Sequence, residues 1–257
     1  EVTWSPSEKR DFEDFRKRWA DVSRHLDALR VNYRIEPPRP VATALVSTGP
    51  ARVSFEPPPG GGTIRYTLDG SVPDASAPAY EKPIAVERTA KVTAVLFRPG
   101  GARSAPVTVD VVRHRATAPP PLEPGLRVDG YRGTFARVPE FDGLKTAFSA
   151  DVDGVAFSGQ EPEENFALRY TGYLRVEKAQ VYTFRLGSDD GSVLDVAGAR
   201  VISNDGLHGY VVRTGRVHLE PGVYPFEVGY FERGGAQRLT FEIDGSAALL
   251  RPVTEKR

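Results

Sequence analysis

Residues 181–186 read VYTFRL, and this stretch decides the fold of the larger part of the chain. Its Tyr, Phe and Leu occupy alternate positions and therefore share one face of an extended strand. Residues 224–230 (YPFEVGY) repeat the alternation after a Pro-Gly turn, and residues 239–243 (LTFEI) do so again. Repeated alternation between turn signals predicts a large β-sandwich over residues 125–251.

Two proline-rich stretches separate this region from the rest. They are residues 36–40 (EPPRP) and 118–124 (APPPLEP), which predict stiff, extended connectors because proline fixes φ and cannot donate a backbone hydrogen bond. Between them, residues 64–68 (IRYTL) alternate before an Asp-Gly turn, and residues 92–97 are apolar on both faces, as in a central strand. Residues 40–115 therefore predict a small β-sandwich.

The N-terminal segment predicts an amphipathic helix. Residues 5–8 (SPSE) form a capping box, with Ser5 as the N-cap and Pro6 in the first helical position. Large apolar side chains then recur at helical spacing on one face: Phe12, Phe15, Trp19, Val22, Leu26 and Leu29. Such a face must be buried. It is expected to pack against a domain that this chain lacks or, alternatively, against the neighbouring sandwich.

Composition excludes several classes of function. The chain has 257 residues, with 34 Lys+Arg balanced by 34 Asp+Glu, so a nucleic-acid partner is not expected. Cysteine is absent, which excludes disulfides and Cys-ligated zinc. No apolar run approaches the ~20 residues of a membrane helix. Methionine is also absent, and the opening EVTW predicts that the chain starts inside a longer protein.

Two stretches then resemble the end of a known enzyme family. Residues 1–6 (EVTWSP), the helix and residues 29–34 (LRVNYR) resemble the last barrel helix of family-twenty glycoside hydrolases, the β-N-acetylhexosaminidases. Residues 64–73 (IRYTLDGSVP), with Tyr80 and Pro-Ile at 83–84, are similar to the immunoglobulin-like domain at the C-terminus of chitobiases and hexosaminidases.

A third resemblance covers the rest of the chain. Residues 166–173 (FALRYTGY), 188–192 (SDDGS) and 204–209 (NDGLHG) resemble the protective-antigen-type (PA-fourteen, or PA14) module, a β-sandwich often attached to glycosidases and adhesins. Together the resemblances imply a mainly β chain with three parts, in this order: a remnant helix of a (β/α)8 catalytic barrel (1–35), the immunoglobulin-like domain (40–115) and a PA14-like domain (125–251).

The resemblance also implies what the chain does not do. Hexosaminidases of this family use an Asp-Glu pair in a His-x-Gly-Gly-Asp-Glu type motif, and their substrate supplies the nucleophile, unlike the usual two-carboxylate scheme. No such motif occurs here, and the neighbouring Glu163 and Glu164 predict a solvated turn. We expect this chain to have no catalytic activity of its own.

The expected function is an accessory, carbohydrate-binding region of a secreted β-N-acetylhexosaminidase acting on N-acetylglucosamine or N-acetylgalactosamine glycosides. Its expected partners are glycans or glycoconjugates and the upstream catalytic barrel. The family implies a secreted or periplasmic location at the bacterial cell envelope. The alternatives are a structural or dimerisation module that braces the barrel, and a free glycan-binding adhesin.

Asp189 and Asp190 form the most informative candidate site. Adjacent side chains in a trans strand point to opposite faces, so both carboxylates can reach one cation only where the backbone is distorted. In calcium-dependent relatives of the module an Asp-Asp pair does so through a cis peptide bond. Calcium needs about 6–8 oxygen ligands, which loop carbonyls and sugar hydroxyls would complete. Alternatively, the two carboxylates bind loop amides while Gly191 adopts a positive φ.

Four further residues are candidates for glycan binding. Asn204, Asp205 and His208 could form the facing edge of the site, or else a turn that satisfies its own backbone. Tyr210 is a candidate stacking platform. A lone histidine does not predict a transition-metal centre. Three other tyrosines fall on apolar faces and are predicted to be core residues: Tyr182, Tyr224 and Tyr230.

Overall fold

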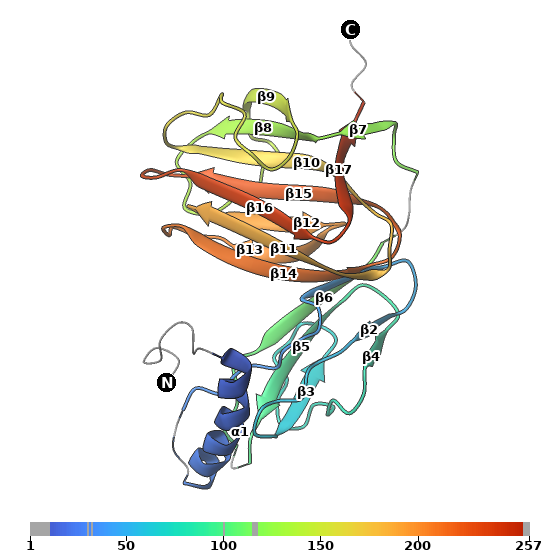
Figure 1. The fold of residues 1–257 in the computed structure, drawn as a ribbon, viewed down its shortest axis with the longest axis vertical. Coiled ribbons are helices and arrows are strands. Elements are labelled where there is room, and N and C mark those ends of the chain that lie inside the picture. Colours follow the sequence, from blue (N-terminus) through green and yellow to red (C-terminus); the bar gives the residue numbers. More distant parts are fainter. Residues whose placement is uncertain (1–10, 30, 32, 100, 115–117, 254–257) are drawn as a thin grey trace. The chain divides into compact units, whose positions relative to one another are not determined.

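The computed structural model of the chain describes residues 11–29, 31, 33–99, 101–114 and 118–253. Within these ranges the protein is mainly β with one helix, α1 (Phe12–Ala28), which confirms the predicted fold class (Figure 1). The residues divide into two compact units. The first unit consists of residues 1–41, 52–86 and 90–109, and the second of residues 42–51, 87–89 and 110–257. Among the described helical residues no stretch is long and apolar enough to cross a membrane.

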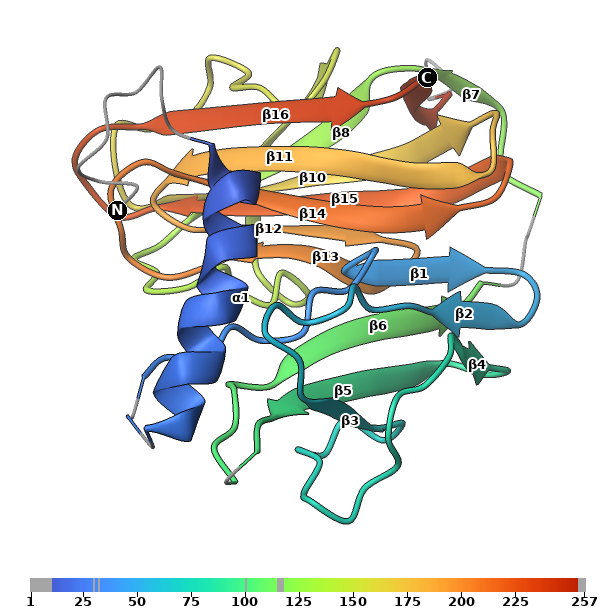
Figure 2. The same cartoon turned by 60° about the horizontal axis from the view of Figure 1, so that its bottom comes forward.

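Helix α1 begins later than the sequence predicts. Its N-cap is Asp11, whose carboxylate accepts a hydrogen bond from the Asp14 amide at 3.0 Å, and Leu29 caps its C-terminal end. The cap oxygen satisfies one of the amides that a helix leaves unpaired in its first turn. Figure 2 shows α1 as one continuous helix. The predicted capping box at residues 5–8 lies outside the described residues.

Within the first unit α1 is held by the face that carries Trp19, Ser23 and Leu26, so part of its apolar stripe takes part in the packing. Ser23 is fully buried, and the Arg98 guanidinium lies 3.5 Å from its hydroxyl and 3.9 Å from the Asp27 carboxylate. This agrees with the alternative that the helix packs on the neighbouring sandwich. The stripe itself is only partly covered, since Val22 is 45% exposed and Leu29 60% exposed.

The strands of the first unit include β2 (Ala51–Val53), β3 (Thr63–Thr67), β4 (Ile84–Val86) and β5 (Ala90–Phe97), of which β3 and β5 are antiparallel. β3 pairs with β5, with Ile64 opposite Leu96, and β2 pairs with β4. Val92, Val95 and Leu96 are almost completely buried. A strand apolar on both faces is therefore an interior strand, as predicted.

The second unit is the larger sandwich. Its strands are β1 (Ala44–Ser47), the end of β6 (Val107–Arg113), β7 (Leu122–Pro124), β8 (Leu126–Arg132), β9 (Thr146–Val152), β10 (Phe166–Val176), β11 (Gln180–Asp189), β12 (Ser192–Val196), β13 (Ala199–Asn204), β14 (Val211–Leu219), β15 (Gly222–Glu232), β16 (Arg238–Asp244) and β17 (Ala247–Pro252). One layer has the order β16-β11-β14-β1, and the other β13-β12-β15-β10-β17-β7. β8 pairs with β10 and β9 (Figure 1).

β1 belongs to this second unit, although the sequence prediction put residues 40–115 in the small domain. It runs parallel to β14, with Ala44 opposite Val217, and parallel to the end of β6. The Thr43 hydroxyl accepts a hydrogen bond from the Arg216 amide at 2.8 Å. Backbone pairing therefore groups β1 with the second unit, and the domain bounds 40–115 and 125–251 stay a prediction.

The core of the larger sandwich is aromatic and follows the predicted alternation. The fully or almost fully buried side chains include Tyr182, Phe184, Leu186, Tyr224, Phe226, Val228 and Tyr230. Burial of one such side chain contributes about 1.5–3 kcal/mol. The tyrosine hydroxyls keep hydrogen bonds, for example from Tyr182 to the Lys178 carbonyl oxygen at 3.0 Å. The prediction that the three tyrosines are core residues is confirmed.

Candidate functional site

The predicted site residues lie at one end of the larger sandwich, where several strands end or begin. Asp189 ends β11, Asn204 ends β13, and residues 205–210 lead into β14. Ser192, at the start of β12, pairs with both Asn204 and Tyr230. Strand pairing therefore brings together segments that are distant in the sequence. We call the set Asp189, Asp190, Asn204, Asp205, His208, Tyr210 and Glu232 the strand-end cluster.

The acidic pair lies between the end of β11 and the start of β12. The peptide bond between Asp189 and Asp190 is cis. Asp190 is 7% exposed, and its two carboxylate oxygens accept hydrogen bonds from the His208 amide at 3.2 Å and the Arg233 amide at 3.1 Å. Asp190 thus holds two loops together, which is what the alternative interpretation predicted for it.

Asp189 differs from its neighbour. Its side chain is half-buried, and in the described part of the chain no hydrogen bond or ion pair engages its carboxylate. Its backbone carbonyl oxygen accepts a hydrogen bond from the Tyr230 hydroxyl at 2.5 Å. The pair therefore has one carboxylate that organises the loops and one that remains available to a ligand.

Gly191 does not adopt the positive φ that the alternative interpretation gave it; Gly206 does, with φ 110°. Glycine is required at 191 for space. A Cβ there would lie 2.5 Å from the Phe231 ring and 2.8 Å from the Gly206 nitrogen, too close for any side chain. Two loops and a core aromatic ring meet at this residue.

Asn204 and Asp205 mainly fix the backbone around them. Asn204 is 3% exposed and donates to the Ser188 hydroxyl at 3.0 Å and to the Val211 carbonyl oxygen at 2.9 Å. One Asp205 oxygen accepts hydrogen bonds from the amides of Val138 and Gly206. Both residues are therefore occupied in positioning loops, in line with the turn interpretation.

His208 and Tyr210 are also engaged. The two ring nitrogens of His208 each lie 2.8 Å from a backbone carbonyl oxygen, those of Gly209 and Asn204. A neutral imidazole has one N–H and can donate to only one of them. The Tyr210 hydroxyl pairs with Thr240 at 2.8 Å, and the Arg238 guanidinium lies 4.0 Å from the Tyr210 ring centroid. Arg238 covers one ring face and leaves at most the other for stacking.

Sequence reasoning missed Glu232, which is fully buried in the cluster. One of its oxygens accepts a hydrogen bond from the Tyr230 hydroxyl at 2.9 Å, and the other has no partner among the described residues. Burial raises the pKa of its carboxyl, the nearby Asp190 charge adds to this, and the Tyr230 hydrogen bond opposes it. The alternation of β15 could have revealed it, because Val228, Tyr230 and Glu232 share the core-facing side.

The oxygen donors in the strand-end cluster are of the type that calcium prefers, namely carboxylate and carbonyl oxygens. Two carboxylates are fewer than the about 6–8 oxygen ligands that calcium takes. No three His, Cys, Asp or Glu side chains converge as a metal group within the described residues. A calcium ion here would be ligated by Asp189 and Asp190, with loop carbonyls, water or ligand hydroxyls at its other positions.

Two family models match the chain. The PA14 domain model covers residues 123–253, and the model described as chitobiase/beta-hexosaminidase C-terminal domain covers residues 43–108. A beta-hexosaminidase of Porphyromonas gingivalis (strain ATCC BAA-308 / W83) is 26% identical over 250 residues. That alignment covers 88% of this chain and 31% of the relative, so the chain spans about a third of the length of the relative.

Solved structures with some similarity include PA14 domains of other proteins. The PA14 domain of the MpAFP antifreeze protein has a TM-score of 0.46 at 15% identity, covering 54% of this chain and 96% of that one. The epithelial adhesin 9 A domain of Candida glabrata, solved with Galb1-4GlcNAc, has a TM-score of 0.38 at 16% identity, covering 53% and 93%. A PA14 sugar-binding domain from an RTX adhesin has a TM-score of 0.34 at 18% identity, covering 49% and 94%.

Proposed function

The chain belongs to the PA14 domain family through residues 123–253, and from this premise we propose that it is a non-catalytic, glycan-binding accessory region of a β-N-acetylhexosaminidase. The proposed ligands are N-acetylglucosamine- or N-acetylgalactosamine-containing glycans. The mechanism is proximity: a tethered binding module raises the local concentration of substrate without changing the chemistry. In the proposed parent enzyme, residues 1–35 belong to the end of the catalytic barrel.

The tandem order of the two domain matches carries this proposal. A hexosaminidase C-terminal match at residues 43–108 is followed by a PA14 match at 123–253, and one beta-hexosaminidase aligns across both. We propose a secreted or periplasmic location, at the bacterial cell envelope, because polymeric glycans are found there.

Calcium is part of the proposal. In it, Asp189 and Asp190 bind the ion, and sugar hydroxyls complete its coordination shell. The available Asp189 carboxylate supports this role, whereas Asp190 already accepts two amide hydrogen bonds. Each carboxylate oxygen has a second lone pair, so these hydrogen bonds are compatible with a cation.

The test uses the whole 257-residue chain and calcium chloride. Asp189→Asn keeps the shape of the side chain and removes its charge, so we expect loss of calcium binding in isothermal titration calorimetry with little change in stability. Glu242→Gln is the matched control, since Glu242 is an exposed residue of the same sandwich, paired with Arg185 at 3.4 Å. An array of N-acetylglucosamine and N-acetylgalactosamine glycans should show about millimolar binding that calcium strengthens. Absence of glycan binding with and without calcium contradicts the function.

One observation favours a second function, bracing of a catalytic barrel. Val22 and Leu29, at one edge of the apolar stripe, stay 45% and 60% exposed although the face with Trp19 and Ser23 packs within the first unit. If this stripe packs on a barrel, Val22→Asp with Leu29→Asp will lower the melting temperature of the longer enzyme and leave that of the isolated chain unchanged. Equal effects in both contexts contradict bracing.

A further inference from the structure

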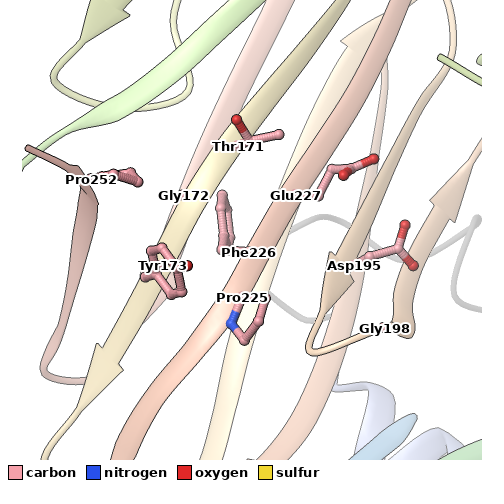
Figure 3. A pocket seen from close by; sticks show the side chains of 9 residues that line it. All are labelled: Thr171, Gly172, Tyr173, Asp195, Gly198, Pro225, Phe226, Glu227 and Pro252. Carbon is pink, nitrogen blue, oxygen red and sulfur yellow. The ribbon is translucent and has the colours of Figure 1, made fainter. Parts of the chain in front are cut away.

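An open trough crosses the middle of the second unit's larger sheet, apart from the strand-end cluster. Its volume is about 560 Å³, within the range of roughly 300–1,000 Å³ that is usual for ligand sites. We call it the outer-face trough; its lining residues are Thr171, Gly172, Tyr173, Asp195, Gly198, Pro225, Phe226, Glu227 and Pro252 (Figure 3). Glu227 precedes Glu232 by five strand residues, which is roughly 17 Å along β15.

Strand register arranges these side chains in two rows. Glu227 of β15 lies opposite Thr171 of β10 on one side and opposite Asp195 of β12 on the other. The next row in the same direction pairs Tyr173 with Pro225. The first row is therefore polar and the second is apolar, and both face away from the buried Phe226.

The apolar row offers a flat platform. Tyr173 is half-buried, Pro225 is exposed, and Pro252 lies on the other side of Tyr173 in Figure 3. No hydrogen bond joins the Tyr173 hydroxyl to another of the described residues. An aromatic side chain with an accessible body and a free hydroxyl suits a ligand that has both C–H faces and hydroxyl groups.

The polar row carries hydrogen-bonding groups without excess charge. Glu227 is paired with Arg169 at 2.9 Å, and Asp195 is paired with Arg200 at 2.7 Å. Each carboxylate keeps lone pairs for further hydrogen bonds, while its arginine neutralises it. Paired charges beside a flat aromatic platform favour a neutral polyhydroxy ligand over an ion.

We propose that the outer-face trough is a second, calcium-independent site for a neutral oligosaccharide. The sugar stacks on Tyr173 between Pro225 and Pro252, and its hydroxyls donate to Glu227 and Asp195. The ligand class rests on the glycan-binding function proposed above. The position of the site, its residues and its independence of calcium are argued from the trough alone. Two sites on one module would raise the avidity for a polymer.

The test measures binding of chitohexaose and cellohexaose to the whole chain, in EDTA and in calcium. In EDTA we expect binding to persist. Tyr173→Ala should weaken it at least about tenfold, because the variant lacks the aromatic ring on which the sugar stacks. Tyr173→Phe, which keeps the ring, should retain most of it. Glu227→Gln should weaken it less than Tyr173→Ala, and unchanged circular dichroism of each variant controls for folding.

The outcomes separate the two proposals. Binding in EDTA that Tyr173→Ala does not alter overturns the trough. Binding that needs calcium and is lost in Asp189→Asn also overturns the trough but supports the proposed function. Binding in EDTA that is lost in Tyr173→Ala supports the trough, and further binding that appears only in calcium and is lost in Asp189→Asn supports the proposed calcium site as well. Absence of binding to both sugars in both conditions overturns the trough as well.

Discussion

The strand-end cluster and the outer-face trough belong to the same sandwich but use their acidic residues differently. In the cluster, Asp190 is buried, and both of its carboxylate oxygens accept hydrogen bonds from backbone amides. In the trough, Asp195 and Glu227 are half-exposed and paired with arginine side chains. A carboxylate that accepts hydrogen bonds from backbone amides fixes the conformation of a loop. A carboxylate paired with an arginine side chain does not fix the backbone, whose conformation is then set by strand pairing.

The largest expected effect tests this difference directly. Asp190→Ala leaves the His208 and Arg233 amides without their charged acceptor and should reduce the free energy of unfolding by about 3 kcal/mol. Asp195→Ala breaks a partly exposed ion pair and should cost no more than about 1 kcal/mol. Urea denaturation in EDTA measures both. Equal losses would show that the two carboxylates have the same structural role.

A second prediction concerns the crowding of the cluster. Gly191→Ala forces a methyl group against the Phe231 ring and the Gly206 backbone, so it should cost about 2 kcal/mol of stability. Gly209→Ala is the matched control in the facing loop, since no atom lies within 4 Å of its added Cβ. It should change stability by less than about 0.5 kcal/mol. Thermal unfolding of the two variants decides the matter, and a harmless Gly191→Ala would mean that the loops are not tightly packed.

The smallest expected effect concerns His114, a titratable residue outside both the strand-end cluster and the outer-face trough. Its pH dependence gives a reference against which effects of the acidic residues can be compared. Burial lowers the pKa of His114, whose ring lies 5.3 Å from that of Tyr224. The fold therefore favours the neutral imidazole. Its contribution to stability is complete above the unfolded pKa near 6.5 and is lost as the pH falls through that value towards the lower folded pKa.

His114→Phe keeps the ring contact and removes this titration. The difference in stability between wild type and variant should shrink, or change in favour of the variant, as the pH falls from 7.5 to 5. Denaturation midpoints across this range measure it. Parallel profiles for the two proteins would show that His114 is not responsible for any acid sensitivity.

The sequence by itself determined the large-scale organisation. Alternation at residues 181–186 and 224–230 predicted strands whose apolar faces are buried, because side chains in a strand must alternate. The 3.6-residue spacing predicted α1, although its cap at Asp11 depends on local geometry. The loop residues that join the strand-end cluster were also identified in advance, since the Asp-Asp-Gly and Asn-Asp-Gly segments are distinctive.

Only the tertiary structure decided how those residues are used. Hydrogen bonds from His208 and Arg233 reach Asp190 across 18 and 43 residues of sequence, and no local pattern encodes such distances. Glu232 is buried where β15 pairs with Phe166 of β10, and one of its oxygens has no partner among the described residues. The row of Thr171, Glu227 and Asp195 exists because three strands share one register. Register is set by the packing of the whole sheet, and this is the physical reason that the trough could not be seen in the sequence.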